Sequence, residues 1–304
     1  MKRKRLASAL LAIAALSFSV AFATGQEVDK TCPIAENFEI TTYRNVSVDG
    51  QLRATDPNGD VLCYKITTEP TKGKIDLEDD GSFVYTPAEG KRGRDYFGYR
   101  ATDAQGNSSS EATVLISIKK QKTQVCYSDL EGCGAGYAAC MLAERGIFVG
   151  ECVGGQYMFR PEAMVTRGDF LKMCMELSEY DVLSGVITTG FSDDNDIPAY
   201  LKPYVSTALL AGVIKGYSDG SRTAVFDPNS SISYPEAAVI LNKTMRLTDV
   251  SPQTMAGTAP VWAEQACSNL SACRISDYPG EELLTRADCA NMLLGAMQIL
   301  SERK

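Results

Sequence analysis

The distribution of polar and apolar positions in the C-terminal half of the chain predicts three helix starts. In each, a hydroxyl residue is followed three positions later by an acid and then by an apolar run. This is the pattern of a capping box, in which the hydroxyl accepts from the third helical N–H and the acid accepts from the N–H of the cap. Because the pattern recurs, it indicates a repeated unit. The segments are Thr166-Arg167-Gly168-Asp169, Ser233-Tyr234-Pro235-Glu236 and Thr285-Arg286-Ala287-Asp288.

A second recurrent feature marks the beginning of each unit. An aromatic or aliphatic residue, a hydroxyl residue and an acid occur at Tyr127-Ser128-Asp129, Phe191-Ser192-Asp193 and Leu247-Thr248-Asp249. From this acid to the second position of the capping box the distances are 38, 41 and 37 residues, which indicates one supersecondary unit used three times. A first helix is predicted between the two marks, most clearly at 199–212, where Gly212 ends it as glycine commonly does. Gly146 occupies this position in the first unit and Arg274 in the third.

Upstream, residues 33–120 show a different periodicity. Alternating or β-branched runs are separated every 8 to 15 residues by turns rich in Asp, Asn and Gly, as in an antiparallel β-sandwich. The predicted strands are 45–48, 61–67, 82–86, 95–102 and 112–118, and the turns lie at 56–59, 79–81 and 105–107.

The three C-terminal units resemble S-layer homology repeats. The middle unit matches best, in the segments Phe191-Ser192-Asp193, 212–220 and Phe226-Asp227-Pro228-Asn229. The first unit matches at Gly146-Ile147 and Phe159-Arg160-Pro161. The third matches at Val261-Trp262-Ala263 and Asp277-Tyr278-Pro279-Gly280. The resemblance covers repeats at 125–180, 190–246 and 247–300. It implies an all-α module with pseudo-threefold symmetry, whose grooves bind the secondary polymer attached to bacterial peptidoglycan.

The upstream unit resembles the bacterial immunoglobulin-like or cadherin-like domains (tandem-95 type) of secreted surface proteins. The likeness is carried by 80–87, 93–99 and Thr102-Asp103. Such sandwiches serve as spacers, adhesins and enzyme appendages, so the fold does not decide the function. Its turn acids, among them Asp56, Asp60, Asp95 and Asp103, are oxygen donors for calcium, but Asp and Asn are also what turns need for their own backbone bonds. We expect the turn role and no metal.

Two arginines are the main candidates for binding an anionic wall polymer. Arg167 and Arg286 follow the cap, so each guanidinium is expected beside unpaired N–H groups at a positive helix end; a solvated arginine at an ordinary helix start is the alternative. Tyr234 and Pro235 replace this pattern in the second unit, where acid binding is not expected. Trp262, the one tryptophan, could stack on sugar or pack in the core. By the resemblance, the polymer-binding residues are Asp129, Thr166, Arg167, Asp193, Gly216, Tyr217, Asp219, Gly220, Asp249, Trp262, Thr285 and Arg286.

The N-terminus predicts export. Four basic residues at 2–5 precede an apolar run at 6–22 and the small-x-small site Ala21-Phe22-Ala23, which together form a signal peptide at 1–23. A linker at 24–32 follows. The apolar run is short for a retained membrane anchor, so we expect no membrane attachment after cleavage. With no cysteine directly after the site and no sorting tail, attachment to the cell surface should be noncovalent.

The net charge limits the classes of partner that this chain can bind. Four of the 30 basic residues and none of the 38 acids lie in the signal peptide, so the net charge moves from −8 to −12 on cleavage. An acidic chain is a poor binder of polyanions through its overall field, which argues against nucleic acid. Affinity for an anionic wall polymer must therefore come from a few arginines in shaped grooves.

Ten cysteines in an exported chain favour disulfides. Cys32 and Cys63 are the two in the sandwich and are predicted to pair there. Cys267 and Cys289 take apolar helix positions in the third repeat and are also predicted to bond, and Cys140 with Cys174 is the parallel pair in the first repeat. Zinc is the alternative, but the chain has no C-x-x-C pair and no histidine.

The absence of histidine excludes Ser-His-Asp and Cys-His catalysis, and no cofactor is predicted. A carboxylate pair could still hydrolyse a glycoside, yet no two acids are placed together reproducibly. We therefore expect a noncatalytic protein of the bacterial cell wall or S-layer, with a secondary wall polymer or peptidoglycan-associated glycan as partner, and other surface proteins as further partners of the sandwich. The alternative is a secreted protein with degenerate repeats, acting as an interaction module or a polysaccharide-active enzyme.

Overall fold

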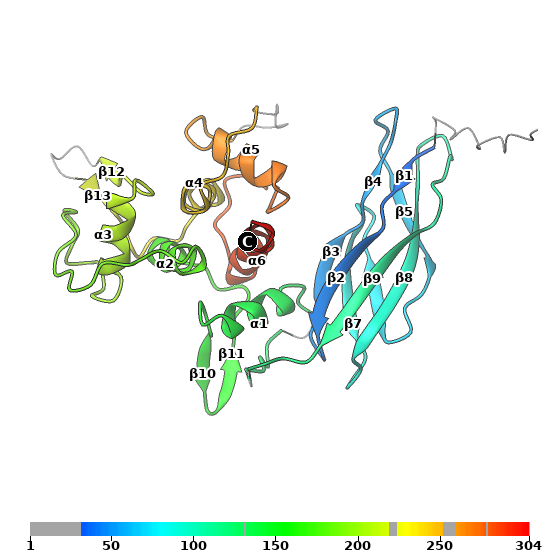
Figure 1. Ribbon diagram of the computed structural model, residues 1–304, viewed down its shortest axis with the longest axis horizontal. Coiled ribbons are helices and arrows are strands. Elements are labelled where there is room, and N and C mark those ends of the chain that lie inside the picture. Colours follow the sequence, from blue (N-terminus) through cyan, green and yellow to red (C-terminus); the bar gives the residue numbers. More distant parts are fainter. Residues whose placement is uncertain are drawn as a thin grey trace, which may run out of the picture.

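The computed structural model describes residues 32–123, 125–130, 132–218, 224–251, 259–277 and 279–303. The predicted signal peptide at 1–23 and the linker up to residue 31 lie outside these residues. Figure 1 shows a β-sandwich beside a helical module. Within the described ranges, none of the helices is long and apolar enough to cross a membrane.

The sandwich is built from two main sheets with strand orders β2-β9-β8-β5 and β3-β7-β6, plus the short pair β1-β4. Its core consists of inward-facing side chains at alternate positions, as the period-two pattern predicts, among them Phe83 and Tyr85 from one sheet and Phe97, Val114 and Ile116 from the other. The strands are β1 (Ile34–Ala35), β2 (Phe38–Tyr43), β3 (Val48–Gln51), β4 (Ala54–Thr55), β5 (Cys63–Thr68), β6 (Gly73–Leu77), β7 (Ser82–Pro87), β8 (Gly93–Thr102) and β9 (Ala112–Lys119).

Two details of the sandwich differ from the prediction. β2 pairs with β9 in parallel, so the four-stranded sheet is mixed and not wholly antiparallel. The strand predicted to begin at Asn45 begins at Val48, because Asn45 adopts a left-handed φ of 61° and the Val46 N–H closes a turn onto Tyr43 O at 3.1 Å. β2 and β6 were not predicted, since their charged and half-buried positions give only a weak alternating pattern.

The helical module contains six helices in the described residues, arranged as three inner and three outer helices (Figure 1). The inner helices follow the predicted capping boxes, and each packs against the first helix of the next repeat: α2 with α3, α4 with α5, and α6 with α1. The predicted all-α module also contains two short hairpins, β10-β11 and β12-β13. The elements are α1 (Gly136–Glu144), β10 (Glu151–Val153), β11 (Gln156–Met158), α2 (Arg167–Leu177), α3 (Lys202–Leu210), β12 (Tyr217–Ser218), β13 (Ala224–Val225), α4 (Tyr234–Met245), α5 (Glu264–Ala272) and α6 (Arg286–Glu302).

A closed ring of backbone hydrogen bonds joins the three repeats. The residue before each N-cap donates its N–H to the equivalent residue of another repeat: Val165 to Leu284 O at 3.1 Å, Leu284 to Ile232 O at 2.9 Å, and Ile232 to Val165 O at 2.9 Å. The side chains of all three are buried. The three units therefore gather about a shared pseudo-threefold axis.

A second set of bonds surrounds the ring. The first helical residue of each inner helix donates its N–H to a neighbouring repeat, Arg167 to Ser230 O at 2.9 Å, Tyr234 to Glu282 O at 2.9 Å and Arg286 to Ala163 O at 2.8 Å. These N–H groups have no partner within their own helix, so the bonds satisfy donors that a helix start leaves unpaired.

Each outer helix is followed, two residues after its last residue, by a residue with left-handed backbone, as predicted from glycine at two of the three positions. Gly146, Gly212 and Arg274 have φ values of 70°, 71° and 55°. Arginine therefore adopts the same backbone in the third repeat, where it carries the steric penalty that glycine avoids.

The capping boxes of α4 and α6 are complete, as predicted. Glu236 accepts from the N–H and the hydroxyl of Ser233, each at 3.0 Å. Asp288 accepts from the same two groups of Thr285 at 2.9 and 2.6 Å. α2 keeps the hydroxyl half, in which Thr166 Oγ1 accepts from the Asp169 N–H at 3.2 Å.

The sandwich is docked onto the helical module through α1 and α6. The Asn291 side-chain amide donates to Asp49 Oδ2 at 3.0 Å, and the Tyr43 hydroxyl donates to Glu144 Oε2 at 2.8 Å. Gly134 makes this approach possible, because a Cβ there would lie 2.6 Å from the Cβ of Asp49. The orientation of the two modules is thus fixed by side-chain contacts as well as by the connecting chain.

Breaking the ring should destabilise the helical module. Ile232→Pro removes the N–H that donates to Val165 O and leaves a buried carbonyl without this donor, at a cost of about 1–3 kcal/mol in addition to lost packing. Ile232→Val keeps the N–H and should cost about 0.5–1.5 kcal/mol. Urea unfolding followed by far-UV circular dichroism compares the two variants, and equal midpoints would contradict the role of the ring.

Acid should weaken the module through Glu236. Burial opposes ionisation of this carboxyl, but the Ser233 N–H, the Tyr217 hydroxyl and Arg167 outweigh it and hold its pKa below the ordinary value of 4.5. Because the pKa is lower in the folded state than in the unfolded state, the stability contributed above pH 4.5 is lost as pH falls through the folded pKa. Glu236→Gln should make the urea midpoint less dependent on pH over this range. Glu281→Gln, at an exposed position, is the control and should keep the wild-type slope.

Candidate functional site

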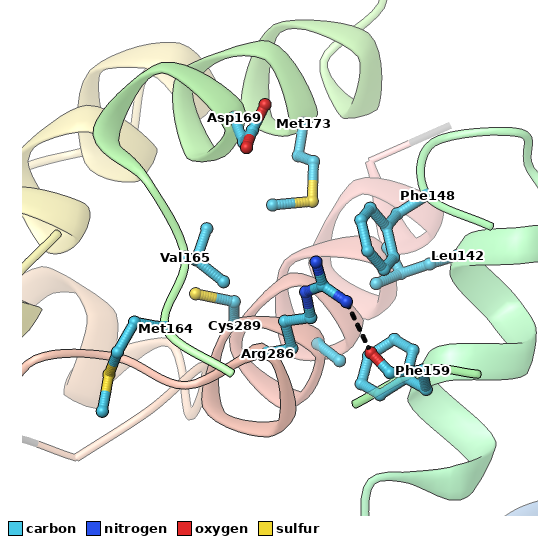
Figure 2. Close-up of a pocket in the computed structure, with 10 residues that line it drawn as sticks. Leu142, Phe148, Phe159, Met164, Val165, Asp169, Met173, Arg286 and Cys289 are labelled. Atoms are coloured by element: carbon cyan, nitrogen blue, oxygen red, sulfur yellow. Dashed lines mark hydrogen bonds between the residues drawn. The ribbon is translucent and has the colours of Figure 1, made fainter. Parts of the chain in front are cut away.

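Arg286 lies in a cavity between α6 and the first repeat. Its Nη1 donates to Phe159 O at 3.0 Å, its Nη2 lies 3.3 Å from Glu151 Oε1, and its guanidinium carbon lies 5.2 Å from the centre of the Phe148 ring. Figure 2 shows the guanidinium pointing between Phe148 and Phe159 into the space lined by these rings. The free space in the cavity is about 30 Å³, and the Arg286 side chain is 21% exposed. An arginine is therefore presented to solvent inside a partly aromatic pocket.

Arg167 occupies the equivalent position on α2 but is closed off. Its Nη1 lies 3.4 Å from Glu236 Oε1, and its guanidinium carbon lies 4.6 Å and 5.5 Å from the ring centres of Tyr217 and Phe226. The Tyr217 hydroxyl also donates to Glu236, and the Arg167 side chain is only 8% exposed. Both arginines therefore pair with a carboxylate, and the Arg286 side chain is the more exposed of the two.

The third equivalent position is Tyr234, which is buried. Its hydroxyl donates to Ser276 O at 3.1 Å, so the side chain joins the second repeat to the third. Tyr234 stands where the other two repeats have arginine, and the expectation that the second capping box does not bind an acid stays a prediction.

The opening acids of the first two repeats hold loop backbone. Asp129 accepts from the N–H groups of Phe159 and Arg160 at 2.9 and 2.6 Å, and Asp193 accepts from those of Phe226 and Asp227 at 2.9 and 2.7 Å. Both oxygens of each carboxylate are engaged, and these acids shape the loops beside the two arginines.

The remaining predicted residues are spread over the module. Asp249 accepts from the Asn269 side chain at 3.0 Å and so differs from the other two opening acids. Gly216 has a φ of 77°, and a Cβ there would lie 2.5 Å from the Phe191 ring. Thr166 and Thr285 cap α2 and α6. Asp219 and Gly220 lie outside the described residues.

Two exposed aromatic residues stand at equivalent places before the outer helices. Trp262 is 62% exposed, so the interpretation of Trp262 as a core residue is wrong. Tyr200, which the sequence reasoning missed, is also exposed, and its hydroxyl donates to Asp169 Oδ1 at 3.2 Å. Tyr200 lies two residues before α3, and Trp262 lies two residues before α5. The equivalent position before α1 is Gly134, which packs against the sandwich. The signal that could have found Tyr200 is its spacing from the following helix.

None of the predicted disulfides is present, since all ten cysteines lie in the described residues and are free thiols. This corrects the pairs Cys32–Cys63, Cys267–Cys289 and Cys140–Cys174. The helical pattern placed Cys267 and Cys289 correctly in the core, but a shared core does not fix which sulfurs are neighbours. Burial raises the pKa of the Cys174 thiol, and Cys289 adds to this shift.

The sandwich acids that were considered as calcium donors accept hydrogen bonds mainly from backbone N–H groups, and one of them, Asp95, lies in β8 and not in a turn. Asp95 accepts from Thr71, Lys72 and Tyr85, Asp56 Oδ1 accepts from two N–H groups of its own turn, and Asp103 closes the turn to Asn107. Asp56, Asp60 and Asp103 each have a carboxylate oxygen within 4.8 Å of the others, an arrangement that sequence spacing did not indicate. The hydrogen bonds of Asp56 and Asp103 support the predicted turn role.

Two family models match parts of this chain. Residues 30–120 match the model of the bacterial cadherin-like domain, and residues 190–238 match that of the S-layer homology domain. The first match coincides with the sandwich, and the second covers α3, the β12-β13 hairpin and the start of α4.

A curated relative is the surface-layer 125 kDa protein of Lysinibacillus sphaericus, which is 26% identical over 143 residues. The match covers 47% of this chain and 11% of that protein, so the chain corresponds to a small part of the relative's length.

Solved structures resemble about a third of the chain. An endo-fucoidan hydrolase of glycoside hydrolase family 107 is 20% identical, with a TM-score of 0.26, over 32% of this chain and 15% of that chain. The SrpA adhesin of Streptococcus sanguinis is 22% identical, with a TM-score of 0.25, over 33% and 62%. Similarity this low carries no argument about function. The matched segments show that the chain combines a bacterial cadherin-like domain with an S-layer homology domain.

Proposed function

We propose that this chain is a noncatalytic protein of the bacterial cell surface, held noncovalently on a secondary polymer linked to peptidoglycan. In this proposal the helical module is the anchor and the sandwich is displayed as a spacer or adhesin. The observation that carries it is Arg286, an accessible guanidinium in a cavity lined by Phe148 and Phe159. The S-layer homology match and the surface-layer relative support the same assignment.

The chemistry of the cavity fits an acidic sugar. A guanidinium can pair with a carboxylate or phosphate through two parallel hydrogen bonds, and the aromatic rings offer apolar surface to a sugar ring. Arg286 is the first residue of α6, where the positive end of the helix favours an anion. The net charge of the whole chain is −8, so attraction must be local to this cavity.

The two other grooves have different roles in this proposal. Arg167 pairs with Glu236 and is 8% exposed, whereas Arg286 pairs with Glu151 and is 21% exposed. An acidic ligand must compete with an internal carboxylate in either groove, but it reaches Arg286 more readily. Exposed Trp262 and Tyr200 are proposed to contact sugar rings at the rims, because exposed aromatic side chains stack readily on apolar faces of sugars. Asp129, Asp193, Asp249 and Gly216 are proposed to support the grooves through the backbone and side-chain contacts described above.

The proposed domain organisation follows the repeat pattern. A signal peptide at 1–23 and linker at 24–32 precede the sandwich at 33–120, and repeats follow at 125–180, 190–246 and 247–300. The hydrogen-bond ring supports three equivalent units, since each contributes one donor and one acceptor to it. The proposed location is the cell wall or S-layer after secretion, with the wall polymer and other surface proteins as partners. Nucleic acid and membrane lipid are not proposed as partners.

Replacing Arg286 should release the protein from cell walls. Arg286→Ala removes the accessible guanidinium, and a charged hydrogen-bonded contact is worth about 1.5–3 kcal/mol, so affinity should fall at least ~10-fold. Arg286→Lys keeps the charge but loses the planar fork and should be intermediate. Cosedimentation with purified walls, before and after chemical removal of the secondary polymer, measures the effect.

Arg100→Ala is the matched control, because it removes one exposed positive charge from the sandwich. It should sediment as wild type does. Each variant is first checked for an unchanged thermal midpoint, so that misfolding is not scored as lost binding. Full retention of folded Arg286→Ala would overturn this site.

Incubation of the protein with wall glycans should release no sugar. The reason is that Glu151, an acid beside Arg286, is held in ion pairs with Arg286 and Arg160, whereas a glycosidase needs two carboxyl groups that act on the substrate. Reducing-end assays over long incubations check this. Release of sugar that disappears in Glu151→Gln would instead identify an enzyme.

A further inference from the structure

A large cleft lies between the sandwich and the first helical repeat. It has a free volume of about 660 Å³ and is lined by the β2–β3 turn, the connecting segment after β9 and α1. Two cysteines line the same cleft, Cys126 on the connecting segment and Cys140 on α1. Cys126 is exposed, whereas Cys140 is buried at the inner wall.

One side-chain amide places the two cysteines close together. Gln121 Nε2 donates to Cys140 Sγ at 2.8 Å and also to Val125 O at 3.4 Å. Val125 directly precedes Cys126, so the Gln121 amide nitrogen bridges the Cys140 sulfur and the backbone next to Cys126. The Cys126 thiol is also near enough to add to the burial that raises the pKa of Cys140 to about 12.

We propose that Cys126 and Cys140 are a redox modification site and form a disulfide under oxidising conditions. The bond would fasten the connecting segment to α1 at the floor of the cleft between the two modules. This inference goes beyond wall attachment and is tested without any cell wall. It differs from the pairing predicted for Cys140 from the sequence, because Cys140 faces the connecting segment and not Cys174.

The oxidation balances with a small-molecule disulfide as the oxidant. The Cys126 thiolate attacks oxidised glutathione, forms a mixed disulfide and releases one glutathione thiolate. The Cys140 thiolate then attacks the Cys126 sulfur, so that the protein disulfide forms and a second glutathione leaves. Two electrons and two protons pass from the protein to the glutathione. The raised pKa of Cys140 keeps its thiolate scarce near neutral pH, which slows the second step.

Peptide mapping of the full, folded chain tests the pair. The protein is incubated with oxidised and reduced glutathione, quenched with acid, alkylated, and cut with trypsin and with a protease specific for glutamate. Cleavage after Lys122 and Glu131 separates Cys126 from Cys140, so a disulfide appears as two linked peptides that reduction separates.

Cys133 is the matched control, because it lies between the two cysteines and is half-buried. The linked peptides should persist in Cys133→Ser and be lost in Cys126→Ser, which changes an exposed residue and should not disturb folding. Loss in Cys140→Ser, in protein with a native circular dichroism spectrum, completes the assignment. Alkylated Cys140 beside glutathionylated Cys126, or a link from Cys126 to any other cysteine, would overturn the proposal.

Discussion

The closed ring of hydrogen bonds among Val165, Ile232 and Leu284 is the constraint on which the helical module depends. Each residue lies immediately before an N-cap, so the ring sets the position of all three inner helices at once. Two residues later, the N–H group of the first residue of each inner helix bonds to a neighbouring repeat. Each outer helix then packs against one inner helix. No repeat completes this arrangement alone, because its donor and its acceptor serve two different partners.

The same ring explains why equivalent residues meet different environments. The first residue of each inner helix faces the next repeat, so Arg286 meets Phe148 and Glu151, whereas Arg167 meets Tyr217 and Glu236. Glu236 closes the second of these pockets because it already accepts from Ser233 and is held in place by its capping box. One symmetric scaffold thus presents two arginines that each pair with a carboxylate, of which Arg286 is more exposed than Arg167.

Local chemistry made the starts of α2, α4 and α6 predictable, since a capping box involves residues only three apart. The parallel pairing of β2 with β9 was not predictable, because it joins segments more than seventy residues apart and leaves no local pattern. The positions of Arg167 and Arg286 followed from the sequence, but their accessibility depends on Glu236 and Glu151 from other repeats or loops. Cysteine pairing failed for the same reason: helical position fixes a face and not a neighbour.

The contact between Asp49, Gly134 and Asn291 ties the docking of the sandwich to the same helices as the proposed site. The sandwich contacts Asn291 of α6 and Gly134 just before α1. α1 and α6 also form walls of the Arg286 cavity, together with the loop at Phe148. The surface that holds the outer domain and the pocket in which the Arg286 guanidinium lies are therefore built from the same two helices.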